Sequence, residues 1–172
     1  EYLDGFALAN NKTGGALHAV VVGFGDQYES VVKLLQEKRF IDSVTLIPRL
    51  PHAVIFGLHH VSDIYVSMNR LANLTNANNE AMVSGDCMII PSSQPDTYVD
   101  VVTDELLDDR AVRRIGFPPL AESLAGAIVD LYQNPQKREL MSSEVVHQSD
   151  QFLWSWDDRI KQEVAAIRSL VC

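Results

Sequence analysis

The residues best suited to chemistry lie in a polar run that separates an apolar segment from a helical one. Residues 69–75 form a loop rich in asparagine, and helical spacing begins near Asn76. The first amides of a helix have no partner inside it, and the helix dipole adds positive potential there, so such a terminus binds phosphate. We therefore place a candidate phosphate site at four consecutive residues: Asn73, Leu74, Thr75 and Asn76.

Glu80 follows within about one turn and carries the carboxylate nearest to this terminus. It can accept hydrogen bonds from sugar hydroxyls beside a bound phosphate. An equally simple interpretation is a carboxylate that stabilises the helix through its dipole. The spacing alone leaves both roles open.

Two further loops follow predicted strands, and the carboxyl ends of parallel strands are where such sheets bind ligands. Gly23 and Gly25 follow the first strand and allow a ligand to approach the backbone closely. Arg49 and Leu50 follow the second strand. A dinucleotide site is disfavoured, because Tyr28 stands where a third glycine is needed and no acidic residue ends the second strand.

The positions of these loops follow from the predicted strands and helices, which alternate along the chain as short apolar runs and amphipathic segments. Strands are predicted at 18–23, 43–47, 63–67 and 87–90, and helices at 2–10, 28–40, 53–61, 76–84, 121–133, 134–141 and 156–171. Residues 94–109 look acidic and irregular, and Trp154 and Trp156 are expected to pack the last helix onto the body. The pattern predicts an α/β fold, a doubly wound parallel sheet of the Rossmann type.

Composition narrows the classes of partner. The net charge of −9 argues against nucleic acid, and no apolar run approaches the roughly 20 residues of a transmembrane segment. The two cysteines are not expected to pair, which favours a reducing, cytoplasmic location. No spacing typical of a metal site is present, so we predict neither a metal nor a cofactor.

The run from Asn73 to Asn76, followed by Glu80-Ala81-Met82 and Gly85, resembles the donor-site motif of retaining GT-B glycosyltransferases. That motif has a Glu, seven intervening residues, a second Glu, then Ala-Met and a nearby Gly. The resemblance implies that Glu80 binds the ribose of a nucleotide and that backbone amides contact its diphosphate. The first Glu of the motif is replaced by Ala72, and no catalytic residue can be assigned.

The resemblance extends over most of the chain and implies one half of a GT-B architecture. Residues 1–172 would then be a single Rossmann-like domain that binds a nucleotide sugar, excised from a longer protein whose N-terminal domain binds the acceptor. The implied activity is transfer of a sugar from a nucleotide diphosphate sugar, which is a substrate rather than a cofactor. Two alternatives stay open: another GT-B enzyme, such as a nucleotide-sugar epimerase, and a non-catalytic domain that binds nucleotide sugars.

Overall fold

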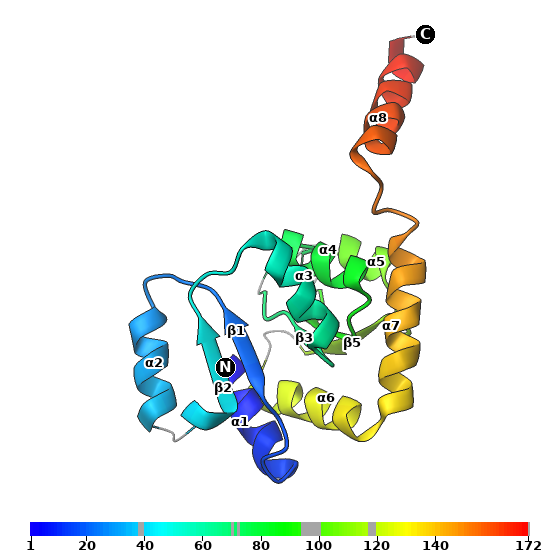
Figure 1. The fold of residues 1–172 in the computed structure, drawn as a ribbon. Helices are drawn as coiled ribbons and strands as arrows, with labels where there is room; N and C mark the ends of the chain where they lie inside the picture. The colour runs from blue at the N-terminus through cyan, green and yellow to red at the C-terminus, as the bar shows by residue number, and fades with distance from the viewer. Residues whose placement is uncertain (38–39, 70, 72, 94–100, 117–119, 172) are drawn as a thin grey trace.

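A computed structural model of the chain describes residues 1–37, 40–69, 71, 73–93, 101–116 and 120–171. Helices and strands alternate along the chain, as Figure 1 shows. The elements are α1 (Tyr2–Lys12), β1 (Ala19–Val22), α2 (Tyr28–Glu37), the 3-10 turn η1 (Ile41–Ser43), β2 (Val44–Ile47), α3 (His52–Val61), β3 (Tyr65–Val66), α4 (Asn76–Ser84), β4 (Met88–Pro91), α5 (Val102–Leu106), β5 (Val112–Ile115), α6 (Ala121–Gln133), α7 (Pro135–Ser149) and α8 (Trp156–Val171).

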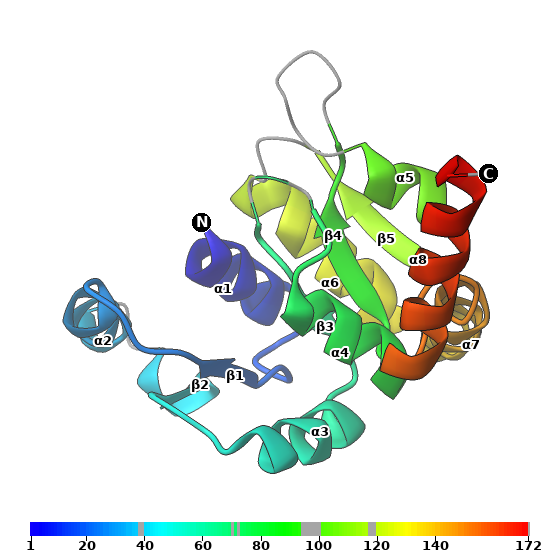
Figure 2. The same cartoon turned by 90° about the horizontal axis from the view of Figure 1, so that it is seen from above.

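The strands form parallel sheets, as the alternation predicted, but in two pieces. β1 pairs with β2 in register from Ala19 opposite Val44, while β3, β4 and β5 form a second sheet with β4 at its centre. Seen from above, the strands follow one another across the molecule in the order β2, β1, β3, β4, β5 (Figure 2). Among the described residues no pairing joins β1 to β3.

The second sheet is covered on both faces, which is the mark of a doubly wound fold. Cys87 and Ile89 pack with α1 and α6, whereas Met88 and Ile90 pack with α4 and α7. This alternation follows from the two-residue period of a strand. All four residues of β4 are buried, which explains why the sequence of this strand is almost wholly apolar. Burial raises the pKa of the Cys87 thiol to about 11, so this cysteine is unreactive.

α1 and α6 make the closest packing between helices. Gly5 of α1 faces α6 so tightly that an added Cβ would lie 2.9 Å from the carbonyl oxygen of Ala121 and 2.9 Å from Leu124. A second part of α1 packs Phe6 against the first sheet, together with Leu35 of α2. α1 therefore ties the two sheets to the same helical layer.

β5 and the short helix α5 were not predicted from the sequence, and α7 continues beyond its predicted end at residue 141. β5 has the sequence Val-Arg-Arg-Ile, in which only the two apolar ends are buried. Arg113 and Arg114 belong to this strand, where the Arg114 side chain is only 15% exposed and pairs with Asp104 and Asp109. Polar residues in an edge strand hide the apolar run that sequence reasoning looks for.

α8 stands apart from the body of the molecule (Figure 1). The Ser155 hydroxyl caps it, accepting a hydrogen bond from the Asp158 amide at 3.2 Å. The prediction that tryptophans pack this helix onto the body was wrong, because Trp154 and Trp156 are 52% and 75% exposed. None of the helices in the described part of the chain has the length and apolarity needed to cross a bilayer.

Candidate functional site

The first turn of α4 has the geometry expected of an anion-binding terminus. Thr75 caps it, since its hydroxyl accepts a hydrogen bond from the Asn78 amide at 3.2 Å. The amides of Asn76 and Ala77 precede any possible partner inside the helix and both residues are exposed. Leu74 packs into the core beside α4, which fixes where this terminus lies.

A network of amide side chains holds the loop that leads into α4. The carbonyl of Asn73 accepts hydrogen bonds from the side-chain amides of Asn69, at 3.3 Å, and Asn78, at 3.1 Å. Asn78 is buried, and its Oδ1 accepts a hydrogen bond from the Tyr65 hydroxyl at 3.0 Å. The asparagines of this run therefore fix the backbone of the loop, a role that a preformed binding loop requires.

Glu80 lies one turn into α4 and is held by a residue from α3. Its Oε1 lies 2.8 Å from Nε2 of His52, the first residue of α3. The Glu80 side chain is 24% exposed and His52 is 70% exposed, so the pair lies at the surface. A carboxylate has about four acceptor positions, so Glu80 can bind hydroxyls while it keeps His52. His52 was not among the predicted site residues.

A second histidine–carboxylate pair connects α3 to the end of α4. Nδ1 of His59 lies 2.6 Å from Oδ2 of Asp86, and these side chains are only 10% and 4% exposed. Burial raises the pKa of Asp86, and the hydrogen bond from His59 opposes that shift. Of the two adjacent histidines of α3, His59 is partly buried and His60 is exposed. The apolar residues around His59 in α3 were the sequence signal that could have indicated its partial burial.

The other predicted site residues lie in the loops that follow β1 and β2. Gly23 follows β1 directly and donates its amide to the Ile47 carbonyl of β2 at 2.9 Å, while Arg49 and Leu50 follow β2. A Cβ added to Gly23 or Gly25 would meet nothing within 4 Å, so the space beside this loop is open to a ligand.

The chain after β2 provides the connection between the two groups of site residues. It leads from Arg49 and Leu50 to His52 and so to Glu80. In Figure 1 the loops after β1 and β2 run along the top of the molecule, where α3 and α4 also lie. Ala72, at the place of the first Glu of the motif, lies outside the described residues. No group of three potential metal ligands occurs within the described ranges.

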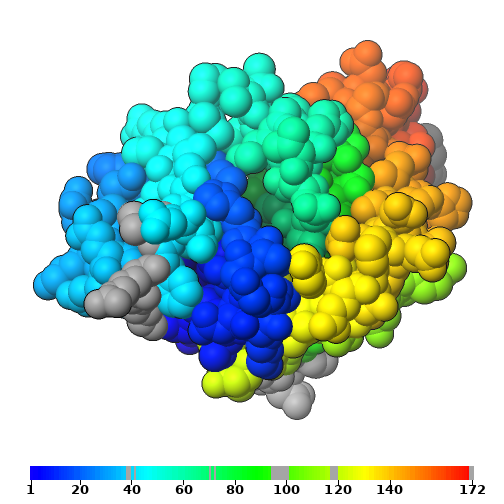
Figure 3. Space-filling model, turned by 60° about the horizontal axis from the view of Figure 1, so that its bottom comes forward, coloured from blue at the N-terminus to red at the C-terminus, as the bar shows by residue number. Residues whose placement is uncertain are grey.

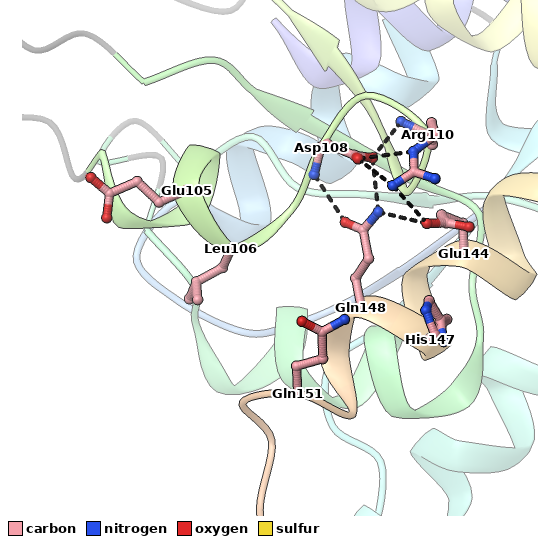
Figure 4. Close-up of a pocket in the computed structure, with 8 residues that line it drawn as sticks. All are labelled: Glu105, Leu106, Asp108, Arg110, Glu144, His147, Gln148 and Gln151. Carbon is pink, nitrogen blue, oxygen red and sulfur yellow. Dashed lines mark hydrogen bonds and ion pairs between the residues drawn. The ribbon is translucent and has the colours of Figure 1, made fainter.

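A polar hollow of about 340 Å³ lies elsewhere, between α5 and α7, and three of the charged side chains that line it are paired with one another (Figure 4). Arg110 contacts Asp108 at 2.7 Å and Glu144 at 3.2 Å. Gln148 accepts a hydrogen bond from the Asp108 amide and donates to both carboxylates. These hydrogen bonds, above all that from Arg110, hold the pKa of Asp108 well below its usual range. We interpret these contacts as structural, because they hold the segment before β5 against α7. The N-terminus of α4 remains the better candidate for a ligand site.

Comparisons with known proteins place this geometry in a fold class. No family model matches the chain, and no curated protein matches it. Among solved structures, sucrose-phosphate synthase from Thermosynechococcus elongatus is 18% identical with a TM-score of 0.76, covering 98% of this chain and 42% of the synthase. Anabaena HepE, solved in complex with UDP and glucose, is 16% identical with a TM-score of 0.75, covering 98% of this chain and 43% of HepE.

The third similar structure is a single domain. It is the C-terminal domain of the group 1 glycosyltransferase LpcC from Francisella tularensis, 14% identical with a TM-score of 0.69, covering 87% of this chain and 78% of that domain. The chain thus spans less than half of the synthase and HepE, but most of the isolated LpcC domain. It has the fold of the Rossmann-like C-terminal domain of GT-B glycosyltransferases, as the resemblance predicted.

Proposed function

We propose that this chain is the donor domain of a glycosyltransferase and binds a nucleotide diphosphate sugar at the N-terminus of α4. The observation that carries the proposal is the capped, exposed first turn of α4 with the carboxylate of Glu80 one turn further on. The similarity to HepE, solved with UDP and glucose, supports the same class of ligand.

Each part of this site has a distinct chemical task. The amides of Asn76 and Ala77 face the diphosphate, and the helix dipole stabilises its negative charge as it leaves the sugar. Glu80, held by His52, accepts hydrogen bonds from the ribose hydroxyls. The open loop at Gly23 and Gly25 and the segment Arg49–Leu50 border the rest of the ligand.

The proposal includes the context in which the domain works. Acceptor binding belongs to an N-terminal domain of a longer polypeptide, and transfer requires both domains. This assignment is supported by the coverage of less than half of the synthase and of HepE. We place the protein in the cytoplasm, where nucleotide sugars would be its substrates and its buried Cys87 would stay reduced.

Titration of the ¹⁵N-labelled chain with UDP, GDP and ADP, followed by NMR, tests the binding site. We expect chemical-shift changes at residues 73–77 and at Glu80, because these amides lie nearest to the phosphates and the ribose. Glu80→Gln should weaken binding about 10- to 100-fold, since hydrogen bonds to charged groups contribute roughly 1.5–3 kcal/mol. Glu37→Gln on α2, where the glutamate is 62% exposed, should bind like the parent.

Other outcomes would count against particular parts of the proposal. Shifts confined to the hollow between α5 and α7 would place the ligand site elsewhere. Equal affinities for the Glu80→Gln and Glu37→Gln proteins would remove the role assigned to Glu80. A longer polypeptide that binds UDP-sugars yet neither transfers nor hydrolyses them would favour a non-catalytic domain, and interconversion of the sugars would favour an epimerase.

A further inference from the structure

Two histidines near the ends of α3 both face α4. His52, Phe56 and His59 are separated by four and then three residues, so they share one face of α3. His52 contacts Glu80, one turn into α4, and His59 contacts Asp86, just beyond the end of that helix. Both ribbon views show α3 lying beside α4 (Figures 1 and 2). α3 is therefore joined to α4 at two points.

These two contacts matter because α3 is not held by deep apolar packing. None of its residues is buried, although most of them are apolar. Figure 3 shows α3, in teal, at the surface of the molecule. The pair of His59 and Asp86 fastens one end, since these side chains are only 10% and 4% exposed. At the other end Pro51 is the N-cap residue, and its ring restricts the backbone directly before His52.

The imidazole of His52 has a neighbour on each of two sides. Its Nε2 lies 2.8 Å from Oε1 of Glu80. The ring of Phe56 packs against it in an edge-to-face arrangement, with the centroids 5.3 Å apart. An ionised carboxylate only accepts hydrogen bonds, so Nε2 carries a proton and donates it to Glu80. Within the described ranges the other oxygen, Oε2, has no protein partner and can accept hydrogen bonds from a ligand.

Glu80 lies on the face of α4 that leads to the candidate phosphate site. Asn76 and Glu80 are four residues apart, so they follow one another along that face. In a nucleoside diphosphate the pentose is joined directly to the phosphates, so phosphates at the first turn place its hydroxyls near Glu80. A glutamate that is free in solution loses side-chain freedom when it binds them, and this loss weakens binding. His52 restricts Glu80 before the ligand arrives, which removes part of that cost.

We propose that His52 is a positioning residue, which holds the Glu80 carboxylate ready for the ribose hydroxyls of the donor and so makes the site selective for ribose over deoxyribose. His52 touches no atom of the nucleotide and acts through Glu80. The inference rests on the proposed function, because it assigns a task to the partner of the carboxylate that binds the ribose.

The affinities of the 1–172 chain for UDP and for its 2′-deoxy and 3′-deoxy analogues test this role by NMR titration. The parent should bind UDP about 10-fold or more tightly than the analogue that lacks the hydroxyl bound by Glu80. His52→Ala should reduce this preference about 3- to 10-fold, because Glu80 must then be ordered on binding. The affinity for that analogue should change little. The same series with GDP and ADP makes the result independent of the base.

Three further variants separate positioning from general damage. His52→Gln keeps an N–H donor with a reach similar to that of Nε2 and should restore most of the preference. In a Glu80→Ala background, His52→Ala should have no further effect on the preference, because the side chain through which it acts is gone. His18→Ala removes an exposed histidine whose Nε2 lies 2.8 Å from the Thr45 hydroxyl, and it should bind like the parent. His52→Ala should leave the urea midpoint almost unchanged, since exposed pairs contribute little to stability.

The possible failures have different meanings. A preference for UDP that survives His52→Ala unchanged would overturn the inference and leave the proposed function intact. Equal losses of affinity for UDP and for its deoxy analogues would also overturn it, because they would indicate damage to the helix terminus. An effect of His52→Ala that persists in the Glu80→Ala background would show that His52 contacts the nucleotide itself. If UDP, GDP and ADP all fail to bind the parent, the proposed function is wrong, and this inference with it.

Discussion

Replacing His59 with alanine should destabilise the domain strongly at neutral pH and much less in mild acid. The substitution leaves the Asp86 carboxyl, 4% exposed, without the nitrogen that now lies 2.6 Å away. Leaving a buried charge without its partner typically costs 3–5 kcal/mol. The loss has an upper limit, because the carboxyl left without a partner can take up a proton instead of staying charged. At pH 7, three units above the ordinary pKa of a carboxyl near 4, protonation costs about 4 kcal/mol. We therefore expect a loss of about 3–4 kcal/mol at pH 7.

The pH dependence follows from the direction of the Asp86 shift. A carboxyl whose folded-state pKa is raised contributes stability below its unfolded pKa and loses that contribution as the pH rises. The raised pKa of Asp86 means that its burial opposes folding at neutral pH, and His59 offsets this effect. Without His59 the penalty should shrink to about 1 kcal/mol near pH 4.5, plus the loss of packing.

Urea unfolding followed by far-UV circular dichroism between pH 4.5 and 8 measures both effects. Asp86→Asn is the matched variant, because it keeps a hydrogen-bonding group but cannot ionise. The double variant His59→Ala with Asp86→Asn should lose most of the pH dependence. A single His59→Ala loss below about 1 kcal/mol at pH 7, or a loss that does not vary with pH, would refute the reasoning.

Three further substitutions test the packing and the caps, each by urea unfolding. Gly5→Ala should destabilise the domain by about 1–3 kcal/mol, because the added methyl group meets α6. Gly126→Ala is the control and should be neutral or stabilising, because the space around its Cβ is open. Equal effects of the two substitutions would contradict the tight contact between α1 and α6. Thr75→Ala should cost about 1 kcal/mol while Thr75→Ser keeps the cap, and identical midpoints would show that the cap contributes nothing. Gly85→Ala should cost about 1–2 kcal/mol, since φ is 75° and Val146 lies 3.3 Å from the added Cβ; an unchanged midpoint would mean that the helix end relaxes.

The sequence was informative wherever a single physical signal dominated. The predicted helix at 76–84 matches α4 to the residue, because Thr75, an apolar face and Gly85 mark its ends. β4 was equally plain, since a strand buried on both faces is apolar throughout. Glu80 could be placed on α4 for the same reason, and its position beside the helix terminus follows from helix geometry.

Other features depend on contacts that no local pattern encodes. The pairs His52–Glu80 and His59–Asp86 join residues that are 28 and 27 positions apart, and nothing near a histidine indicates which carboxylate will meet it. β5 escaped prediction because Arg113 and Arg114 occupy its centre. The division of the sheet was also invisible, because an unpaired edge has the same sequence as a paired one.

The placement of α8 affects how the stability of this protein has to be measured. The chain has two tryptophans, and both lie at the base of α8 with their rings largely in solvent. Their fluorescence in the native protein should already be that of hydrated indole, and unfolding of the sheets should change it little. A denaturation curve recorded at tryptophan wavelengths would follow the fraying of one outlying helix, so backbone dichroism is the signal that reports on the domain.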